Sequence, residues 1–353
     1  MDKASAEKTI IGRVESPHLS NLSVAVSPHI KNDVTVEKIM WTVSACLMPP
    51  LILSVFIFGF QTLIITAVSV ISCVVIEAIS QKSFRQPIMI KDGSAVITGL
   101  LMAYTIPPNV PYWMPILGAF MAIFITKVIM GGIGYNIFNP ALIGRAFLLA
   151  TFPVAMTATW VSPIRDNNLF KYMDSGVDII TTATPLYIIK HYGISGLMEK
   201  FGSMSEIYTN FFFGFRPGCI GETSAVLILM GGIILLYKKY ITWHIPVSMI
   251  LTVGLLSWVF GGPQWFSGNP FIAVLSGGIM LGAFFMATDY VTSPTMKTGQ
   301  IIFGIGVGAL TVLIRLKGGY PEGVCYAILL MNPLTPALDQ WFRPKRFSEG
   351  ATQ

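Results

Sequence analysis

Residues 62–80 read TLIITAVSVISCVVIEAIS, an apolar run with a single charged side chain, Glu77. A helix needs about 20 such residues to cross the hydrocarbon core of a bilayer. The whole chain of 353 residues has the same character, with 53% hydrophobic and 11% charged residues, whereas soluble domains carry about 25% charged residues. We therefore predict an all-α integral membrane protein that crosses the bilayer many times.

Outward from this run, the sequence contains about ten candidate spanning segments. The third and fifth are short or begin beside Pro and Gly, so they are candidates for half-helices buried in protein. The ten segments are 40–60, 62–80, 94–107, 113–131, 138–155, 223–239, 243–261, 271–290, 299–316 and 321–339.

The distribution of Lys and Arg predicts the orientation. Basic residues follow every second apolar run, as at Lys82, Arg85, Lys238 and Lys239, and cytoplasmic loops are the ones enriched in Lys and Arg. Both termini are then inside, which agrees with an even number of spans. Arg315 and Lys317 are exceptions, because they fall on the predicted outer side. The net charge of +6 belongs to these flanking segments and gives no reason to expect a nucleic-acid partner.

The chain divides into five parts on this basis. A cytoplasmic segment (1–39) precedes a first group of five helices (40–155), and a second group (223–340) precedes a cytoplasmic tail (341–353). The polar segment 156–222 joins the two groups and lies on the outer face. Motifs recur in both groups, including Asn-Pro at 139–140 and at 332–333. Five helices per group make the second repeat inverted, an arrangement that transporters use to form sites near the midplane.

The outer segment contains VDIITTATPLYI at 177–188, a cluster of threonines between apolar stretches. Pro185 biases Thr184 to an extended backbone, and the small Ala183 leaves space beside it, so we expect its hydroxyl to point outward as an acceptor for a modifying enzyme. Asp178 could position a metal–phosphate group in that enzyme. Taken by itself, the cluster is equally typical of an ordinary Ser/Thr turn.

The segment D-x-x-T-T-A-T-P-L (178–186) resembles a flavin-attachment motif. Residues 91–108 and 131–147 resemble segments of the D subunit of the Rnf complex, an ion-translocating oxidoreductase that couples reduced ferredoxin to NAD. The chain is more distantly similar to the B subunit of the sodium-pumping NADH:quinone oxidoreductase. The resemblance covers roughly residues 35–345.

The resemblance implies that a flavin transferase joins FMN to Thr184 by a phosphoester bond, making the chain a phosphoprotein. Thr182 stands where the family often has glycine, as does Ile179, so Thr181 and Thr182 are competing acceptors, but the A-T-P-L register selects Thr184. The resemblance also implies electron transport coupled to Na⁺ or H⁺ export, the A, B, C, E and G subunits of the Rnf complex as partners, and a second, non-covalent riboflavin. The location implied is the inner membrane of a bacterium or the plasma membrane of an archaeon.

Three acidic residues are further candidates for ion or flavin contacts. Glu77 and Asp289 lie near the ends of apolar runs, where an acid is either functional or simply tolerated. Asp92 is either a cation or flavin-hydroxyl contact or an ordinary helix cap. Lys127 and Arg145 flank the loop GGIGYNIFNP and are candidates to hold a phosphate or a partner carboxylate, or to be interface anchors.

Two other functions fit part of the sequence. Inverted repeats with broken helices are also typical of small-solute transporters and channels, but such a carrier has no use for the threonine strip. The B subunit of the quinone-reducing pump has a longer N-terminal region than this chain. No NAD or iron–sulfur motif occurs in the sequence, so ferredoxin and NAD chemistry would belong to other subunits.

Overall fold

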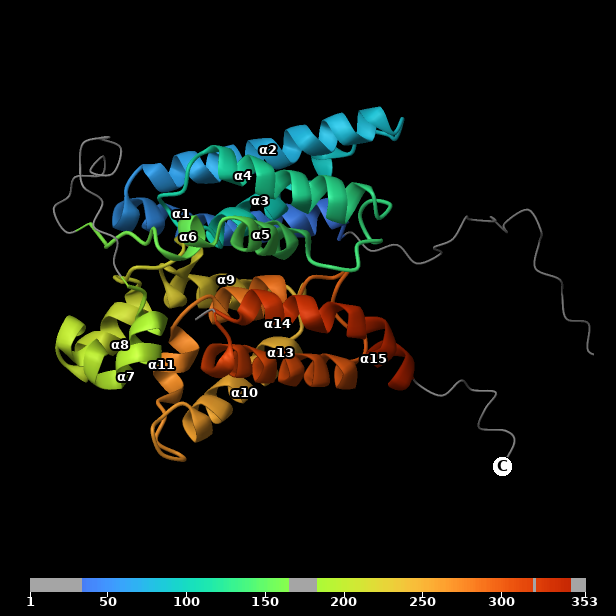
Figure 1. The fold of residues 1–353 in the computed structure, drawn as a ribbon. Coiled ribbons are helices and arrows are strands. Elements are labelled where there is room, and N and C mark those ends of the chain that lie inside the picture. The colour runs from blue at the N-terminus through green and yellow to red at the C-terminus, as the bar shows by residue number, and fades with distance from the viewer. Residues whose placement is uncertain (1–33, 165–182, 320–321, 344–353) are drawn as a thin grey trace, which may run out of the picture. The chain divides into compact units, whose positions relative to one another are not determined.

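The computed structural model describes residues 34–164, 183–319 and 322–343 (Figure 1). These residues form helices and no β-strand, in agreement with the predicted all-α class, and those from Val36 onward pack as one unit. Its longer helices are α1 (Val36–Phe58), α2 (Gln61–Ser83), α3 (Ser94–Tyr104), α4 (Trp113–Ala119), the π-helix η3 (Phe120–Val128), α5 (Pro140–Thr151), α7 (Pro185–Phe201), α8 (Met204–Phe213), α9 (Ala225–Tyr237), α10 (His244–Phe260), α13 (Lys297–Lys317) and α14 (Val324–Met331).

Three of the described helices, α1, α2 and α13, are long and apolar enough to cross a membrane. The third and fifth predicted segments are short, as expected: α3 has 11 residues and α5 has 12. At 1.5 Å per residue, neither covers the roughly 30 Å of a hydrocarbon core. These two helices are surrounded by protein, and ten of the residues of α3 are buried.

Two predicted segments of the second group are interrupted rather than continuous, which corrects their bounds. Segment 271–290 divides into α11 (Pro270–Leu275), α12 (Ile279–Leu281) and the π-helix η5 (Gly282–Met286). The break coincides with Gly277, whose φ of 67° a residue with a side chain rarely adopts. In segment 321–339, α14 ends at Met331. The 3₁₀ helix η6 (Asn332–Leu334) and α15 (Thr335–Trp341) follow it, with Pro333 and Pro336 at their starts.

The helices form two groups that share one hydrophobic core. In the first group α2 packs on α3, α4 and η3, and in the second α10 packs on α13 and α11. Contacts of α1 with α9, and of α5 with α14, join the groups (Figure 1). The two Asn-Pro motifs meet at this junction: with its amide oriented to satisfy both groups, Asn332 accepts from the Asn139 N–H at 3.1 Å.

The segment between the groups contains two further helices, α7 and α8, beside α11 (Figure 1). They have a small core of their own, formed by Ile188, Leu197, Ile207, Phe211 and Ile272. The polar composition of this segment gave no reason to expect a separate core. Its apolar residues form a core only because the folded helices bring them into contact with α11.

Candidate functional site

Thr184 is the N-cap of α7. Its φ and ψ of −66° and 153° are extended, as Pro185 predicts, and its Oγ1 accepts from the Tyr187 N–H at 3.3 Å. The expectation of an outward hydroxyl is wrong for this structure, because Thr184 is 5% exposed. The reason is that the first turn of a helix leaves N–H groups without partners, and a threonine oxygen satisfies one of them.

The surroundings of Thr184 favour a negative group. A helix N-terminus carries partial positive charge and is a ready anion site. The helix α7 also breaks at Gly193 (φ 69°), and its second part brings Lys200 back to the start, where Nζ donates to the Ala183 carbonyl oxygen at 3.2 Å. Desolvation lowers the pKa of Lys200, although the side chain as a whole is exposed. Two positive features therefore flank the threonine.

A pocket opens along the same helix. It encloses about 940 Å³, including the part open to solvent. We name it the Arg315 pocket, after the cation that lines it together with Leu186, Ile189 and Lys190 of α7 and residues of α10 and α11. The Arg315 guanidinium donates to the Ala273 and Ser276 carbonyl oxygens at 2.8 and 2.9 Å, and its Nε has no partner.

The role of Arg315 explains its exception to the charge pattern. It satisfies the last carbonyl groups of α11, which no residue of the helix can satisfy, so it belongs to the packing of this end and not to a loop. Its terminal nitrogen also lies close to Gly277, and Leu186 approaches the same glycine. Leu186 is two residues from Thr184, so the pocket and the threonine are neighbours.

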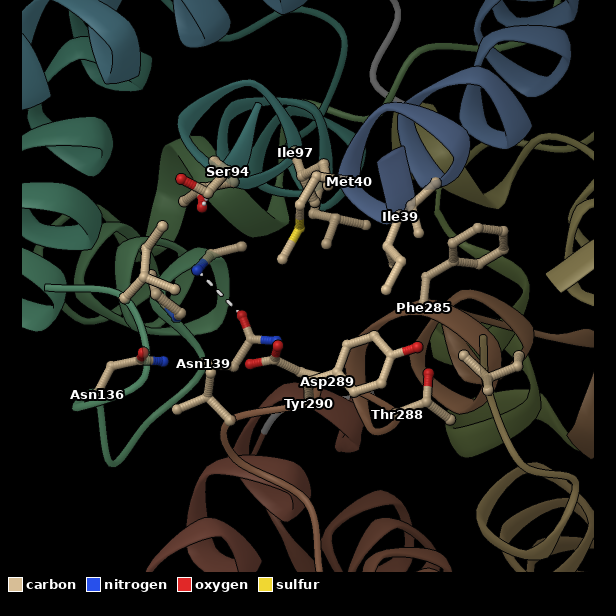
Figure 2. A pocket seen from close by; sticks show the side chains of 18 of the residues that line it. Ile39, Met40, Ser94, Ile97, Asn136, Asn139, Phe285, Thr288, Asp289 and Tyr290 are labelled. Atoms are coloured by element: carbon tan, nitrogen blue, oxygen red, sulfur yellow. Dashed lines mark hydrogen bonds between the residues drawn. The ribbon is translucent and has the colours of Figure 1, made fainter. Parts of the chain in front are cut away.

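A second pocket lies between the two groups of helices (Figure 2). It encloses about 830 Å³, including the part open to solvent, and we name it the Asn139 pocket. Asn139 and Asp289 lie on one side of it, and Met40 and Ile97 lie on the other (Figure 2). Its lining is mostly apolar, with Asn136, Thr98 and Thr288 as further polar residues.

The position of Asn139 follows from its local sequence. It is the N-cap of α5, with Pro140 at the first helical position, and its Oδ1 accepts from the Ala141 N–H at 3.1 Å. Its Nδ2 donates across the junction to the Met286 carbonyl oxygen at 3.3 Å. Asn139 thus fixes η5 against α5. The π-helices η3 and η5 both border this pocket, and π-helical turns are frequent at functional sites.

Lys127 lines the Asn139 pocket, but its charge is already neutralised. Its Nζ lies 2.6 Å from Oε1 of Glu77 and 2.6 Å from Oγ of Ser94. Gln81 donates to the same Glu77 oxygen at 2.9 Å. Of the alternatives that the sequence left open for Lys127, the structure shows a carboxylate partner, and that partner is Glu77 of α2.

The other two acidic candidates lie close to this pair and to the pocket. Asp92 accepts from the N–H and the hydroxyl of Ser94, at 3.0 and 2.9 Å, at the start of α3. Asp92 therefore binds the first residue of α3, whose N-cap is Gly93, and its Oδ2 has no partner among the described residues. Asp289 lines the Asn139 pocket, and its Oδ2 accepts from the Thr292 hydroxyl at 3.1 Å.

Of the remaining predicted residues, some are described by the structure and others are not. Arg145 forms an ion pair with Glu322, so it also holds a carboxylate. Asp178, Ile179, Thr181 and Thr182 lie outside the described residues. Sequence reasoning missed Lys200, for which no local pattern existed. It also missed Asn136 and Asn139 as pocket residues, although the Asn-Pro repeat had drawn attention to Asn139.

The two pockets lie at opposite ends of α13. Asp289 and Val291 precede this helix and line the Asn139 pocket, whereas Val312 and Arg315 near its end line the Arg315 pocket. With 21 residues, α13 is about 30 Å long, about the thickness of a hydrocarbon core. The two pockets therefore lie toward opposite ends of a helix that is long enough to cross a membrane.

Known proteins resemble this chain in sequence over nearly its whole length. A sequence model of the NQR2, RnfD, RnfE family matches residues 23–348. The chain is 51% identical to the D subunit of the proton-translocating ferredoxin:NAD(+) oxidoreductase complex of Clostridium ljungdahlii, over 92% of this chain and 96% of that one. It is 42% identical to the D subunit of the Na(+)-translocating ferredoxin:NAD(+) oxidoreductase complex of Acetobacterium woodii, over 92% and 95%.

A third relative is the D subunit of the ion-translocating oxidoreductase complex of Vibrio cholerae, 37% identical over 92% of this chain and 98% of that one. These matches cover nearly the whole of each chain, so the resemblance found in the motifs extends through both groups of helices. The chain belongs to the NQR2, RnfD, RnfE family.

Proposed function

We propose that this chain is the electron-carrying D subunit of an Rnf-type complex, which couples electron transfer between ferredoxin and NAD to the translocation of Na⁺ or H⁺. The names and the coverage of the relatives support this assignment. The A, B, C, E and G subunits are its partners in a plasma membrane. Ten membrane segments in two inverted repeats suit this role, and the meeting of the two Asn-Pro motifs supports the repeat.

The observation that carries the proposal is the position of Thr184 at a helix N-terminus beside Lys200. A flavin transferase joins FMN to its Oγ1, and the phosphoester then carries a negative charge into a site with partial positive charge on one side and an ammonium group on the other. When bound, FMN supplies the redox chemistry, as cofactors do. This chain holds the phosphate at the α7 N-terminus, with Lys190 and Arg315 lining the adjoining pocket.

The non-covalent riboflavin fits the Asn139 pocket. Riboflavin has no phosphate, and this pocket has no unpaired cation among the described residues that line it, since Lys127 is bound by Glu77. The amides of Asn136 and Asn139 are suited to the carbonyl and N–H groups of a flavin ring, and the apolar walls to its faces. Asp289 is the acidic residue best placed for a flavin or ion contact, ahead of Glu77 and Asp92.

Because the pockets lie at opposite ends of α13, the proposal puts the two flavins near opposite faces of the membrane. The segment with Thr184 is then on the outer face, and the termini are inside. A covalent bond keeps FMN on a side of the membrane that has no pool of flavin to refill an empty site.

The test is the flavin fluorescence of the denatured protein band after co-expression with a flavin transferase. We expect a fluorescent band for the wild type and none for Thr184→Val. Absence of fluorescence in both would contradict the covalent flavin and favour a small-solute carrier.

A further inference from the structure

A cluster of charged residues lies at the junction of the two helix groups, and none of its members lines either pocket described above. Glu222 belongs to the 3₁₀ helix η4 (Ile220–Glu222), which precedes α9, and Glu322 precedes α14. Ligand atoms of Cys219, Glu222 and Glu322 lie within 4.8 Å of one another. A small enclosed pocket brings both carboxylates together with Arg145 of α5 and Tyr104 of α3.

The two carboxylates have different partners. Glu322 forms an ion pair with Arg145. Glu222 is 7% exposed, no cation among the described residues lies within salt-bridge distance of it, and its Oε1 accepts no hydrogen bond. Arg216 binds only the backbone oxygen of Glu222, at 3.3 Å, and lies over the Phe211 ring.

A buried carboxylate that has one oxygen without a partner, no ion pair and a second carboxylate nearby is costly when ionised. Binding a proton removes that cost. A metal ion is a poorer occupant, because the guanidinium groups of Arg145 and Arg216 face the same cluster and repel it. We propose that Glu222 is a proton-binding site, controlled by the Arg145–Glu322 pair across the junction.

The groups around Glu222 agree with this assignment. Burial and the neighbouring Glu322 raise the pKa of Glu222 to about 8, despite opposing effects of Arg216, Arg145 and Arg315. The titratable and charged groups that face it are Tyr104 of α3, Arg145 of α5, Arg216 and Cys219 of its own segment, Arg315 of α13, Glu322, and Cys325 of α14.

A proton-binding site at the junction can respond to movement of the two helix groups relative to each other. Arg145 belongs to the first helix group, and η4, which contains Glu222, packs on α1 and α3 of that group. Glu322 belongs to the second group, so a movement between the groups changes its distance to both Arg145 and Glu222. Proton uptake by Glu222 and the relative position of the groups are then coupled: each equilibrium shifts the other by the same free energy. The site does not depend on a flavin at Thr184.

Infrared spectroscopy of the purified complex tests the proposal. A protonated carboxylic acid has a carbonyl stretch separate from the bands of a carboxylate. We expect such a band at neutral pH and below, and its loss at higher pH with a titration midpoint near the pKa of about 8. Glu222→Gln removes it, whereas Glu199→Gln, which changes an exposed acid of the same segment, leaves it in place.

Two further variants keep the test decisive if Glu222→Gln assembles poorly. Glu222→Asp retains a titrating band, and Glu322→Gln moves the midpoint of the Glu222 band to lower pH, because a like charge is removed. A band that persists in assembled Glu222→Gln, or a wild-type complex with no titrating carboxylic acid band between about pH 5 and about pH 10, would overturn the proposal. Loss of FMN in Thr184→Val leaves this result unaffected.

Discussion

The Arg315 pocket and the Asn139 pocket differ in the charge that they offer a ligand. The first adjoins a helix N-terminus with a capping hydroxyl, and Lys190 and Arg315 line it. The second is lined by amides, hydroxyls, apolar side chains and the Asp289 carboxylate, and its lysine is neutralised by Glu77. This difference in charge is the basis for proposing a phosphorylated flavin at one end of α13 and an uncharged flavin at the other.

The comparison also shows how buried charge is used in this fold. Lys127 and one oxygen of Glu77 form an ion pair, with Ser94 and Gln81 completing the network. The other Glu77 oxygen is buried without a partner, but the lysine matches the charge of the carboxylate. Around Arg315 and Glu222, guanidinium nitrogens and a carboxylate oxygen are also without partners, and no described residue forms an ion pair with Glu222. Unpartnered buried polar groups require an explanation, and a bound anion or a bound proton supplies one.

The largest expected effect separates the acceptor from the cap at Thr184. Asn caps helices as well as Ser or Thr does, but its amide cannot form a phosphoester with FMN. We expect Thr184→Asn to fold like the wild type and to lose all of the covalent flavin, whereas Thr184→Ser keeps both. In-gel flavin fluorescence, with chromatography of the complex as the folding control, measures this. Fluorescence in Thr184→Asn would move the acceptor to Thr181 or Thr182.

The next effect concerns the buried pair beside the Asn139 pocket. Lys127→Met leaves Glu77 buried without its cation, which costs about 3–5 kcal/mol in proteins. We expect a markedly lower midpoint in thermal unfolding in detergent. The double variant Glu77→Leu/Lys127→Met recovers most of the loss, because replacing both partners of a buried pair by apolar residues is often neutral. A single variant as stable as the wild type would mean that the pair contributes little.

A smaller effect distinguishes the cofactors of the two pockets. Asn136 is 7% exposed and lines the Asn139 pocket. Loss of one buried hydrogen bond to a ligand costs about 1–3 kcal/mol, so Asn136→Ala should lower the non-covalent riboflavin content about tenfold. Extraction and chromatography of released flavin measure it, and covalent FMN provides the internal control. An equal loss of both flavins would contradict separate sites.

The smallest effect concerns Lys200. Desolvation lowers its pKa, and a nearby negative phosphoester favours the charged form and raises the pKa again. Flavinylated protein should therefore show a higher midpoint in the pH dependence of Lys200 acetylation than Thr184→Asn does. Lys190 serves as the comparison residue on the same helix. Identical Lys200 profiles in the two proteins would mean that the phosphate lies elsewhere.

The sequence predicted the all-α class and the apolar helices well, because residues such as those of 62–80 carry an unambiguous hydropathy signal. For Lys127 and Arg145 it left open a phosphate, a partner carboxylate or an interface anchor, and the structure shows a carboxylate at each. It could not predict the break at Gly277, where a continuous apolar run conceals a backbone change. Nor could it predict the approach of Lys200 to Ala183, which depends on the reversal of α7 at Gly193.

The central claim is a phosphoester between FMN and the hydroxyl that caps α7. Peptide mass spectrometry of residues 172–190, from protein purified after expression with its flavin transferase, tests it most directly. We expect a mass increase corresponding to FMN less one water, with fragment ions that locate it on Thr184. An unmodified peptide, or a flavin located on a different residue, would contradict the claim.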